Sequence, residues 1–194
     1  MKQIILAATL GLVVAAGPAS AKGLLRDDPT PNPWRPDCLP ASEFALDGVR
    51  LWAPAEDVRA AWDEPAAIGA DSYAHADRHF DFQVWKYPGI FVRIARNQRT
   101  GHDTAFNLET GSSAVSTPSG IHPGMGWGDL VALLGRAPRE EPGRSGGSVT
   151  HSISRCPDPD MDTRAISVEG FPDTLHLEFD ASGVLRRIEI WAGI

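Results

Sequence analysis

Residues 120–138 read GIHPGMGWGDLVALLGRAP, and this stretch decides the fold that we expect because residues 48–65, GVRLWAPAEDVRAAWDEP, repeat its pattern. With an offset of 72 positions, Gly48 aligns with Gly120 at the start of the two stretches. Apolar and acidic residues then recur at matching positions of both copies. The pattern indicates an internal duplication, with two copies of one structural unit in a single chain.

Each copy predicts one short amphipathic helix. Apolar residues at the spacing i, i+3, i+4 share one helix face, which buries against a neighbouring layer. The residues with this spacing are Val58, Ala61 and Trp62 in the first copy, and Leu130, Leu133 and Leu134 in the second. Pro54 suits the opening turn of the first helix, and Gly135 suits a left-handed end of the second.

After each helix the apolar period changes from 3.6 to 2, which is typical of strands with one buried face. Two antiparallel hairpins are expected, one at 80–94 around Pro88-Gly89 and one at 175–191 around 180–183. We therefore expect an α+β fold of two tandem units, 44–112 and 113–194, in which a short helix or helix pair packs on an antiparallel sheet.

The second copy resembles the β-lactamase-inhibitor-protein fold, which the small outer-membrane assembly lipoprotein BamE shares. The residues that carry the resemblance are Gly120, Ile121, Gly124, Met125, Leu130, Gly135, Pro138, Phe179, Gly183, Leu185 and Ile188. The first copy departs from the motif, with Trp52, Ala53 and Asp63 in place of Gly124, Met125 and Gly135. Members of this fold bind other proteins and have no catalytic centre. The resemblance therefore implies a scaffold or inhibitor-like binding role.

The first 21 residues predict a signal peptide. Lys2 precedes an uncharged apolar run, and Ala19-Ser20-Ala21 offers the small residues that precede a cleavage site. The run is shorter than the roughly 20 residues that a membrane-spanning helix needs, so we expect no stable membrane insertion. The expected product is a soluble periplasmic or secreted protein that begins after cleavage near Ala21.

Residues 22–43 form a proline-rich arm, in which prolines disfavour both helix and sheet. The chain contains two cysteines, Cys38 and Cys156. In an oxidising compartment one disulfide is the simplest use of such a pair, although free thiols or a bridge to another chain are alternatives. The disulfide would hold the arm against the body and would close a loop of over a hundred residues, which restricts the unfolded chain in the chain-entropy model.

The formal net charge of −7 argues against nucleic acid as a partner, because nucleic-acid binding needs a basic surface. The expected partner is instead another envelope or secreted protein. Trp52 and Trp127, near the starts of the two helices, and Trp34, in the arm, are the candidate binding residues. The alternative is that all three pack against the body of the protein.

One acidic segment is a candidate metal site. Asp158, Asp160, Asp162 and Glu169 fall at positions 1, 3, 5 and 12 of a calcium-binding loop. Thr163 occupies position 6, where such loops need glycine for a sharp turn. Calcium is thus the one cofactor that the sequence suggests, and a solvated acidic loop is the alternative.

No convincing catalytic set is found. His75 and His79 lie four positions apart but have no third zinc ligand at a defined spacing. Residues 143–147, GRSGG, match G-x-S-x-G without the preceding strand and following helix of a nucleophile elbow. We therefore expect a non-catalytic exported binding protein of the bacterial cell envelope. A periplasmic domain that binds calcium or a small ligand is the alternative, and a hydrolase-type enzyme ranks third.

Overall fold

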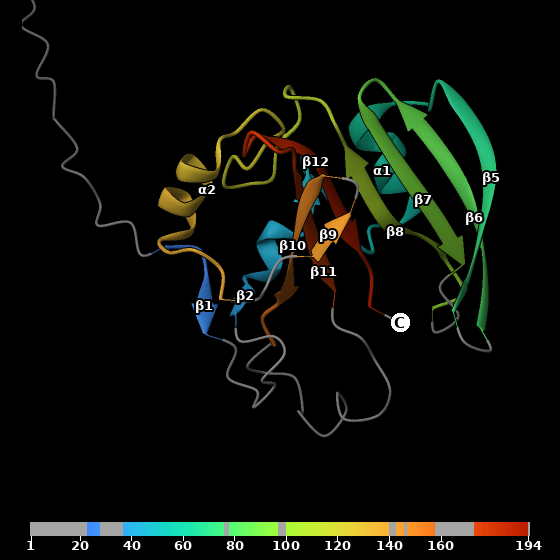
Figure 1. Ribbon diagram of the computed structural model, residues 1–194. Coiled ribbons are helices and arrows are strands. Elements are labelled where there is room, and N and C mark those ends of the chain that lie inside the picture. Colours follow the sequence, from blue (N-terminus) through green and yellow to red (C-terminus); the bar gives the residue numbers. More distant parts are fainter. Residues whose placement is uncertain are drawn as a thin grey trace, which may run out of the picture.

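The computed structural model describes residues 23–27, 37–75, 78–96, 100–139, 143–145, 147–157 and 173–193. A ten-stranded mixed sheet dominates these residues (Figure 1), with strand order β1-β2-β10-β11-β12-β8-β7-β6-β5 and with β9 also paired to β10. The strands are β1 (Arg26–Asp27), β2 (Asp37–Leu39), β5 (Ala67–His75), β6 (Arg78–Tyr87), β7 (Ile90–Arg96), β8 (Asp103–Thr110), β9 (Gly143–Ser145), β10 (Ser148–Arg155), β11 (Thr174–Phe179) and β12 (Leu185–Trp191).

Little helix accompanies this sheet. The two α-helices, α1 (Ala55–Trp62) and α2 (Trp127–Leu134), have eight residues each. A 3-10 helix, η1 (Ala41–Glu43), precedes a two-stranded sheet of β3 (Ala45–Leu46) and β4 (Val49–Arg50). Figure 1 shows α1 beside β7 and β8, and α2 at the other end of the molecule, close to β1.

The predicted α+β class with two tandem helix-on-sheet units is wrong. The fold is mostly β, and strands from both predicted units join in one continuous sheet. Strand β12 pairs antiparallel with β8, with Ile188 opposite Thr110 and Trp191 opposite Asn107. The physical reason is that an edge strand exposes unpaired N–H and C=O groups, which β8 and β12 satisfy by pairing with each other.

The arm also extends the sheet beyond the predicted antiparallel hairpins. Strand β2 pairs in parallel with β10, with Ser154 opposite Cys38, which makes the sheet mixed. Strand β1 then pairs antiparallel with β2. Periodicity in the sequence cannot predict such pairings, because it reports which face of a strand is buried and not which strand lies beside it.

The local elements are confirmed. The two predicted hairpins are β6–β7, with Gly89 in the turn at φ 76°, and β11–β12. Pro54 precedes the first helix, and α2 ends at Gly135 in the left-handed conformation at φ 86°. Helical and strand periodicity are local properties of the chain, and both predict these elements. The buried stripe expected on α1 is only partly correct, because Val58 is buried but Ala61 is exposed.

Both helices cover the same face of the sheet. On α1, Trp62 packs edge-on against Tyr87 of β6 at 5.4 Å. On α2, Trp127 stacks on His151 of β10 at 4.5 Å and packs edge-on against Phe179 of β11 at 5.3 Å. The fully buried side chains of this layer include Leu108, Leu130, Leu134, Leu175, Leu177 and Ile188. The apolar core therefore lies between this face and the helices. Burial of each such side chain contributes roughly 1.5–3 kcal/mol to stability.

The predicted disulfide is confirmed. Cys38 and Cys156 form a bond with an S–S distance of 2.06 Å, which ties β2 to the end of β10. Beside it, the buried Asp37 accepts hydrogen bonds from the side chains of Arg136, at 2.6 Å, and Arg139, at 3.0 Å, and from the backbone N–H of Arg139. Burial alone would raise the pKa of Asp37, but these hydrogen bonds outweigh it and lower the pKa.

The start of the arm also packs against α2. The backbone N–H groups of Leu24 and Leu25 donate to the carbonyl groups of Leu133 and Leu134, which lie at the helix end and lack partners within the helix. Gly23 lies so close to Gly135 that a Cβ atom on either glycine would fall 2.6 Å or less from backbone atoms. Both described ends of the arm are therefore fixed to the body of the protein.

Candidate binding face

The second face of the sheet carries polar and charged side chains. Side chains alternate along a strand, so residues between the buried Leu175, Leu177 and Ile188 point away from the core. On the central strands these residues are Thr150 and Ser152 of β10, His176 and Glu178 of β11, Arg187, Glu189 and Trp191 of β12, Asn107 and Glu109 of β8, and Phe91 and Arg93 of β7. We call this surface the open face.

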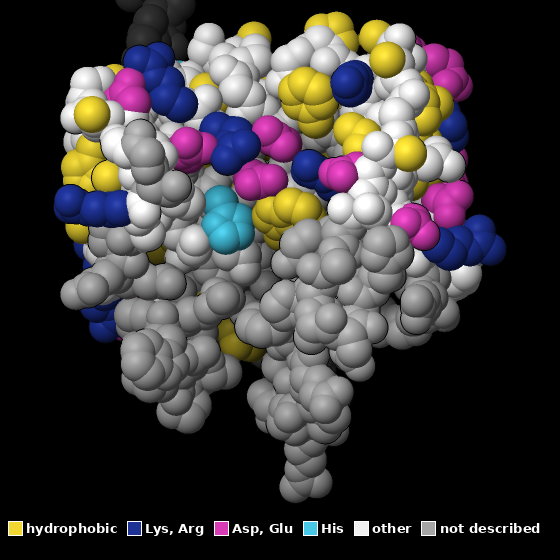
Figure 2. Space-filling view, turned by 45° about the vertical axis from the view of Figure 1, so that its right-hand side comes forward, with side chains coloured by type: hydrophobic (Ala, Val, Ile, Leu, Met, Phe, Trp, Pro, Cys, Tyr) yellow, Lys and Arg dark blue, Asp and Glu magenta, His cyan; other side chains and the backbone are white. Residues whose placement is uncertain are grey.

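Charges of both signs alternate across the open face. Figure 2 shows a row of basic and acidic side chains, with a histidine and hydrophobic side chains next to it. We define the charge band as the side chains of Asp71, Arg93, Glu109, Glu178, Arg187 and Glu189. Its members come from β5, β7, β8, β11 and β12, so the band depends on the order of strands in the sheet.

Two arginines link the carboxylates of the band. Arg187 contacts Glu178 at 2.8 Å and Glu109 at 3.4 Å. Arg93 contacts Asp71 at 3.0 Å and donates to the side-chain oxygen of Asn107 at 2.6 Å. Each guanidinium group is thereby held in one orientation by partners on neighbouring strands.

The buried Asn107 connects the charge band to the sheet. Its side-chain amide donates to the backbone oxygen of Ile190 at 3.1 Å, while its oxygen accepts from Arg93. The guanidinium group of Arg93 also lies 5.2 Å from the ring centre of Trp191, within the range of a cation–π interaction. Arg93 is therefore positioned both by hydrogen bonds and by an aromatic ring.

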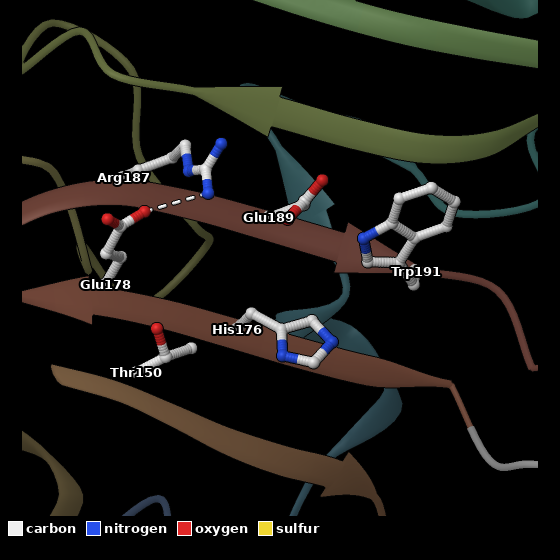
Figure 3. A pocket seen from close by; sticks show the side chains of 6 residues that line it. All are labelled: Thr150, His176, Glu178, Arg187, Glu189 and Trp191. Carbon is white, nitrogen blue, oxygen red and sulfur yellow. Dashed lines mark ion pairs between the residues drawn. The ribbon is translucent and has the colours of Figure 1, made fainter. Parts of the chain in front are cut away.

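A hollow of about 270 Å³ lies in the open face at β10, β11 and β12. Its lining residues, drawn in Figure 3, are Thr150, His176, Glu178, Arg187, Glu189 and Trp191. Beside it, Ser152 and Nδ1 of His176 form a hydrogen bond at 2.8 Å, which orients the imidazole ring. The hollow thus combines acidic, basic and aromatic groups whose positions are set by neighbouring strands.

Glu189 is electrostatically the most perturbed acid of the hollow. Burial raises its pKa, the neighbouring carboxylate of Glu109 raises it further, and Arg187 and Arg93 act in the opposite direction. A hydrogen bond from the Trp191 side chain also favours the charged form of Glu189. The net direction is upward, so the positive charges around Glu189 do not fully compensate its burial.

The two described tryptophans that were candidate binding residues do not line this hollow. The indole N–H of Trp52 donates to Asp173 at 3.1 Å, and its ring packs edge-on against Phe106 at 5.6 Å. Trp127 is half-buried between α2 and the sheet, stacked on His151. Both rings contact the core, as in the packing alternative, and their role in binding stays a prediction.

Trp52 has an unusual backbone conformation. Its φ of 67° lies in the left-handed region, where a bulky side chain costs about 1–2 kcal/mol. Its backbone N–H donates to the oxygen of Ala105 at 2.7 Å, which helps to hold this conformation. Trp52 also lines a second hollow of about 240 Å³, together with Arg50, Arg155 and Asp173.

The acidic candidate for calcium and the third tryptophan cannot be placed. Asp158, Asp160, Asp162 and Glu169 lie outside the described residues, and so does Trp34. Within the described ranges, no group of three or more His, Cys, Asp or Glu side chains is arranged to hold a metal ion. The calcium site therefore stays a prediction.

Of two further sequence candidates, the described residues argue against a catalytic role for one, the G-x-S-x-G segment. Residues 143–145 form β9, which pairs antiparallel with β10 and places Ser145 opposite Ser148. This is a hairpin and not the strand-to-helix turn of a nucleophile elbow. The side chains of His75 and His79 lie outside the described residues.

Among the helices that the structure describes, none is long and apolar enough to cross a membrane.

Sequence reasoning missed the residues of the hollow. It predicted the strands 175–179 and 185–191 but used only their apolar positions. The signal that would have found the hollow is the polar alternation itself, His176 and Glu178 on one strand and Arg187, Glu189 and Trp191 on the next. These rows become one surface only because β11 and β12 pair in register, with Glu178 opposite Arg187.

In comparisons with known proteins, no family model, no curated protein and no solved structure matches this chain.

Proposed function

We propose that this chain is an exported, non-catalytic binding protein of the bacterial cell envelope, which contacts another envelope or secreted protein through the open face of its sheet. The observation that carries the proposal is the contrast between the two sheet faces. The helices and the apolar core lie on one face, while the other presents an ordered band of charges around a hollow beside Trp191. A side-chain array fixed before binding loses little conformational entropy on contact with a partner.

The location in the envelope is part of the same proposal. The disulfide between Cys38 and Cys156 is compatible with an oxidising compartment, where such bonds form and persist. The predicted signal peptide, with cleavage near Ala21, is the sequence argument for export. The motif resemblance to β-lactamase inhibitor proteins and BamE is consistent with a scaffold or inhibitor-like role.

The experiment is affinity capture of the tagged mature protein after mild cross-linking in its own host. The test variant is Glu178→Arg, which reverses a negative charge that lines the hollow. The control is Glu56→Arg, since Glu56 is exposed on α1, which covers the other face of the sheet.

We expect one partner protein to be recovered in similar amounts with the wild type and with Glu56→Arg, and to be lost with Glu178→Arg. Melting temperatures of both variants close to that of the wild type would show that folding is intact. Recovery of no specific protein, or equal recovery with both variants, would contradict the proposal.

A further inference from the structure

The charge band carries more negative than positive charge. It contains the carboxylates of Asp71, Glu109, Glu178 and Glu189, and the guanidinium groups of Arg93 and Arg187. When all six groups are ionised, four negative charges face two positive charges. The whole chain has the same sign, with a net charge of −7. Such a surface attracts a positively charged partner and repels a negatively charged one.

The excess negative charge is concentrated at Glu189. Glu189 lies 3.9 Å from Arg93, whereas Arg93 lies 3.0 Å from Asp71 and Arg187 lies 2.8 Å from Glu178. The side chain of Glu189 is only 18% exposed, and a second carboxylate, Glu109, lies close to it. A further cation in the hollow would offset both the burial and the repulsion.

The aromatic group beside Glu189 suits the same ligand. Trp191 directs its indole N–H toward Glu189, as Figure 3 shows, which places the carboxylate and the ring side by side in the hollow. Arg93 already lies within cation–π distance of this ring. A carboxylate next to a tryptophan ring is a favourable environment for an ammonium or guanidinium group.

The surroundings of the hollow suit a protein as the source of this cation. The hollow of about 270 Å³ has room for one long side chain and opens onto the surface shown in Figure 2. On the same face, Phe91 of β7 is 41% exposed, opposite Glu109 of β8, and provides an apolar contact beside the charges. Anchoring side chains at protein interfaces combine such pockets with nearby apolar contacts.

From these observations we propose that the hollow binds a lysine or arginine side chain of a protein partner, with Glu189 as its counter-charge and Trp191 as its aromatic neighbour. The inference rests on the proposed function and specifies the chemistry of the partner at this site. The partner's cation contacts Glu189, while Glu178 and Glu109 remain bound to Arg187.

The test measures binding of a single side-chain analogue to the complete mature protein. N-acetyl-arginine amide is the probe, and N-acetyl-citrulline amide is its neutral control of nearly the same shape. The indole N–H signal of Trp191, assigned with Trp191→Phe, reports binding by NMR. The variants are Glu189→Gln and, as a matched control on the exposed side of α1, Glu56→Gln.

We expect saturable shifts of the Trp191 signal with the arginine probe. The citrulline probe should bind at least about tenfold more weakly than the arginine probe, because it cannot form the charge-assisted hydrogen bond. Glu189→Gln should weaken arginine binding by a similar factor, and Glu56→Gln should not change it. Equal binding of the two probes, no saturable shift, or unchanged affinity in Glu189→Gln would overturn the inference.

The two proposals fail in different ways. If the wild type captures a partner that Glu178→Arg does not capture, but the arginine probe does not bind at Glu189, the cation site is wrong and the protein-binding function stands. If the probe binds and depends on Glu189 but no partner is captured, the hollow is a site for a free organic cation. That result would overturn a protein as the source of the ligand.

Discussion

Removal of the disulfide is expected to destabilise the protein strongly, because the bond closes a long loop. Cys38 and Cys156 are 118 positions apart in the sequence. In the chain-entropy model a loop of this length reduces the entropy of the unfolded chain enough to stabilise the fold by about 5 kcal/mol at 25 °C. The double variant Cys38→Ala/Cys156→Ala should therefore lose most of this free energy of unfolding.

The folded state should still form without the bond. Parallel pairing of β2 with β10 and the hydrogen bond from the N–H of Cys156 to the oxygen of Leu39, at 2.8 Å, do not require it. The loss should thus appear as lower stability of the same fold. Urea unfolding followed by circular dichroism measures it, and the midpoint should fall by about 2 M relative to the oxidised wild type.

Reductant provides the control for this experiment. Added to the wild type, it should reproduce the lower midpoint, and added to the double variant it should change nothing. A decrease of less than about 1 kcal/mol in the free energy of unfolding would refute the reasoning, because the unfolded chain would then not gain the freedom that the 118-residue separation implies.

The remaining predictions concern the core and two titratable groups. Leu177→Ala, at a fully buried position of β11, should lower the free energy of unfolding by about 2–5 kcal/mol in urea titrations, and a smaller loss would mean that the core collapses around the cavity. Asp37 has a folded-state pKa below its usual value of 3.8, so its contribution to stability is present above pH 3.8 and is lost as the pH falls through the folded pKa. Asp37→Asn should therefore reduce the decrease in urea midpoint between pH 5 and pH 3, and an unchanged decrease would contradict the assignment. Burial lowers the pKa of His151 below 6.5, so the unfolded state binds a proton more readily and stability should fall as the pH drops below 6.5. In His151→Phe the melting temperature should therefore fall less between pH 7 and pH 5.5 than in the wild type. An unaltered pH profile would show that other groups cause the loss.

Local patterns in the sequence were sufficient to predict the two helices and the two hairpins. Alternation at Leu175, Leu177 and Phe179 predicts β11 and its buried face, and the apolar spacing of Leu130 and Leu134 predicts the buried stripe of α2. Both patterns depend on residues a few positions apart, whose side chains share a face because of the geometry of strands and helices.

The candidate site was less predictable, because its residues are adjacent only in the folded sheet. Glu178 and Arg187 belong to one hairpin and are within reach of local reasoning. Asp71 and Arg93 reach the same surface only through the strand order β12-β8-β7-β6-β5. Trp52, a candidate from its position before the helix, donates to Asp173 and lines the second hollow, and its role in binding stays a prediction.

The sequence by itself determined the two helices, the hairpins β6–β7 and β11–β12 and the buried face of β11, and it favoured a disulfide between Cys38 and Cys156. The tertiary structure alone decided that β8 and β12 join all these strands in one sheet, with the helices on one face and the charge band on the other. The physical reason is that side-chain periodicity acts over a few residues, whereas strand pairing is made by backbone groups that are nearly the same in every residue and carry little sequence information.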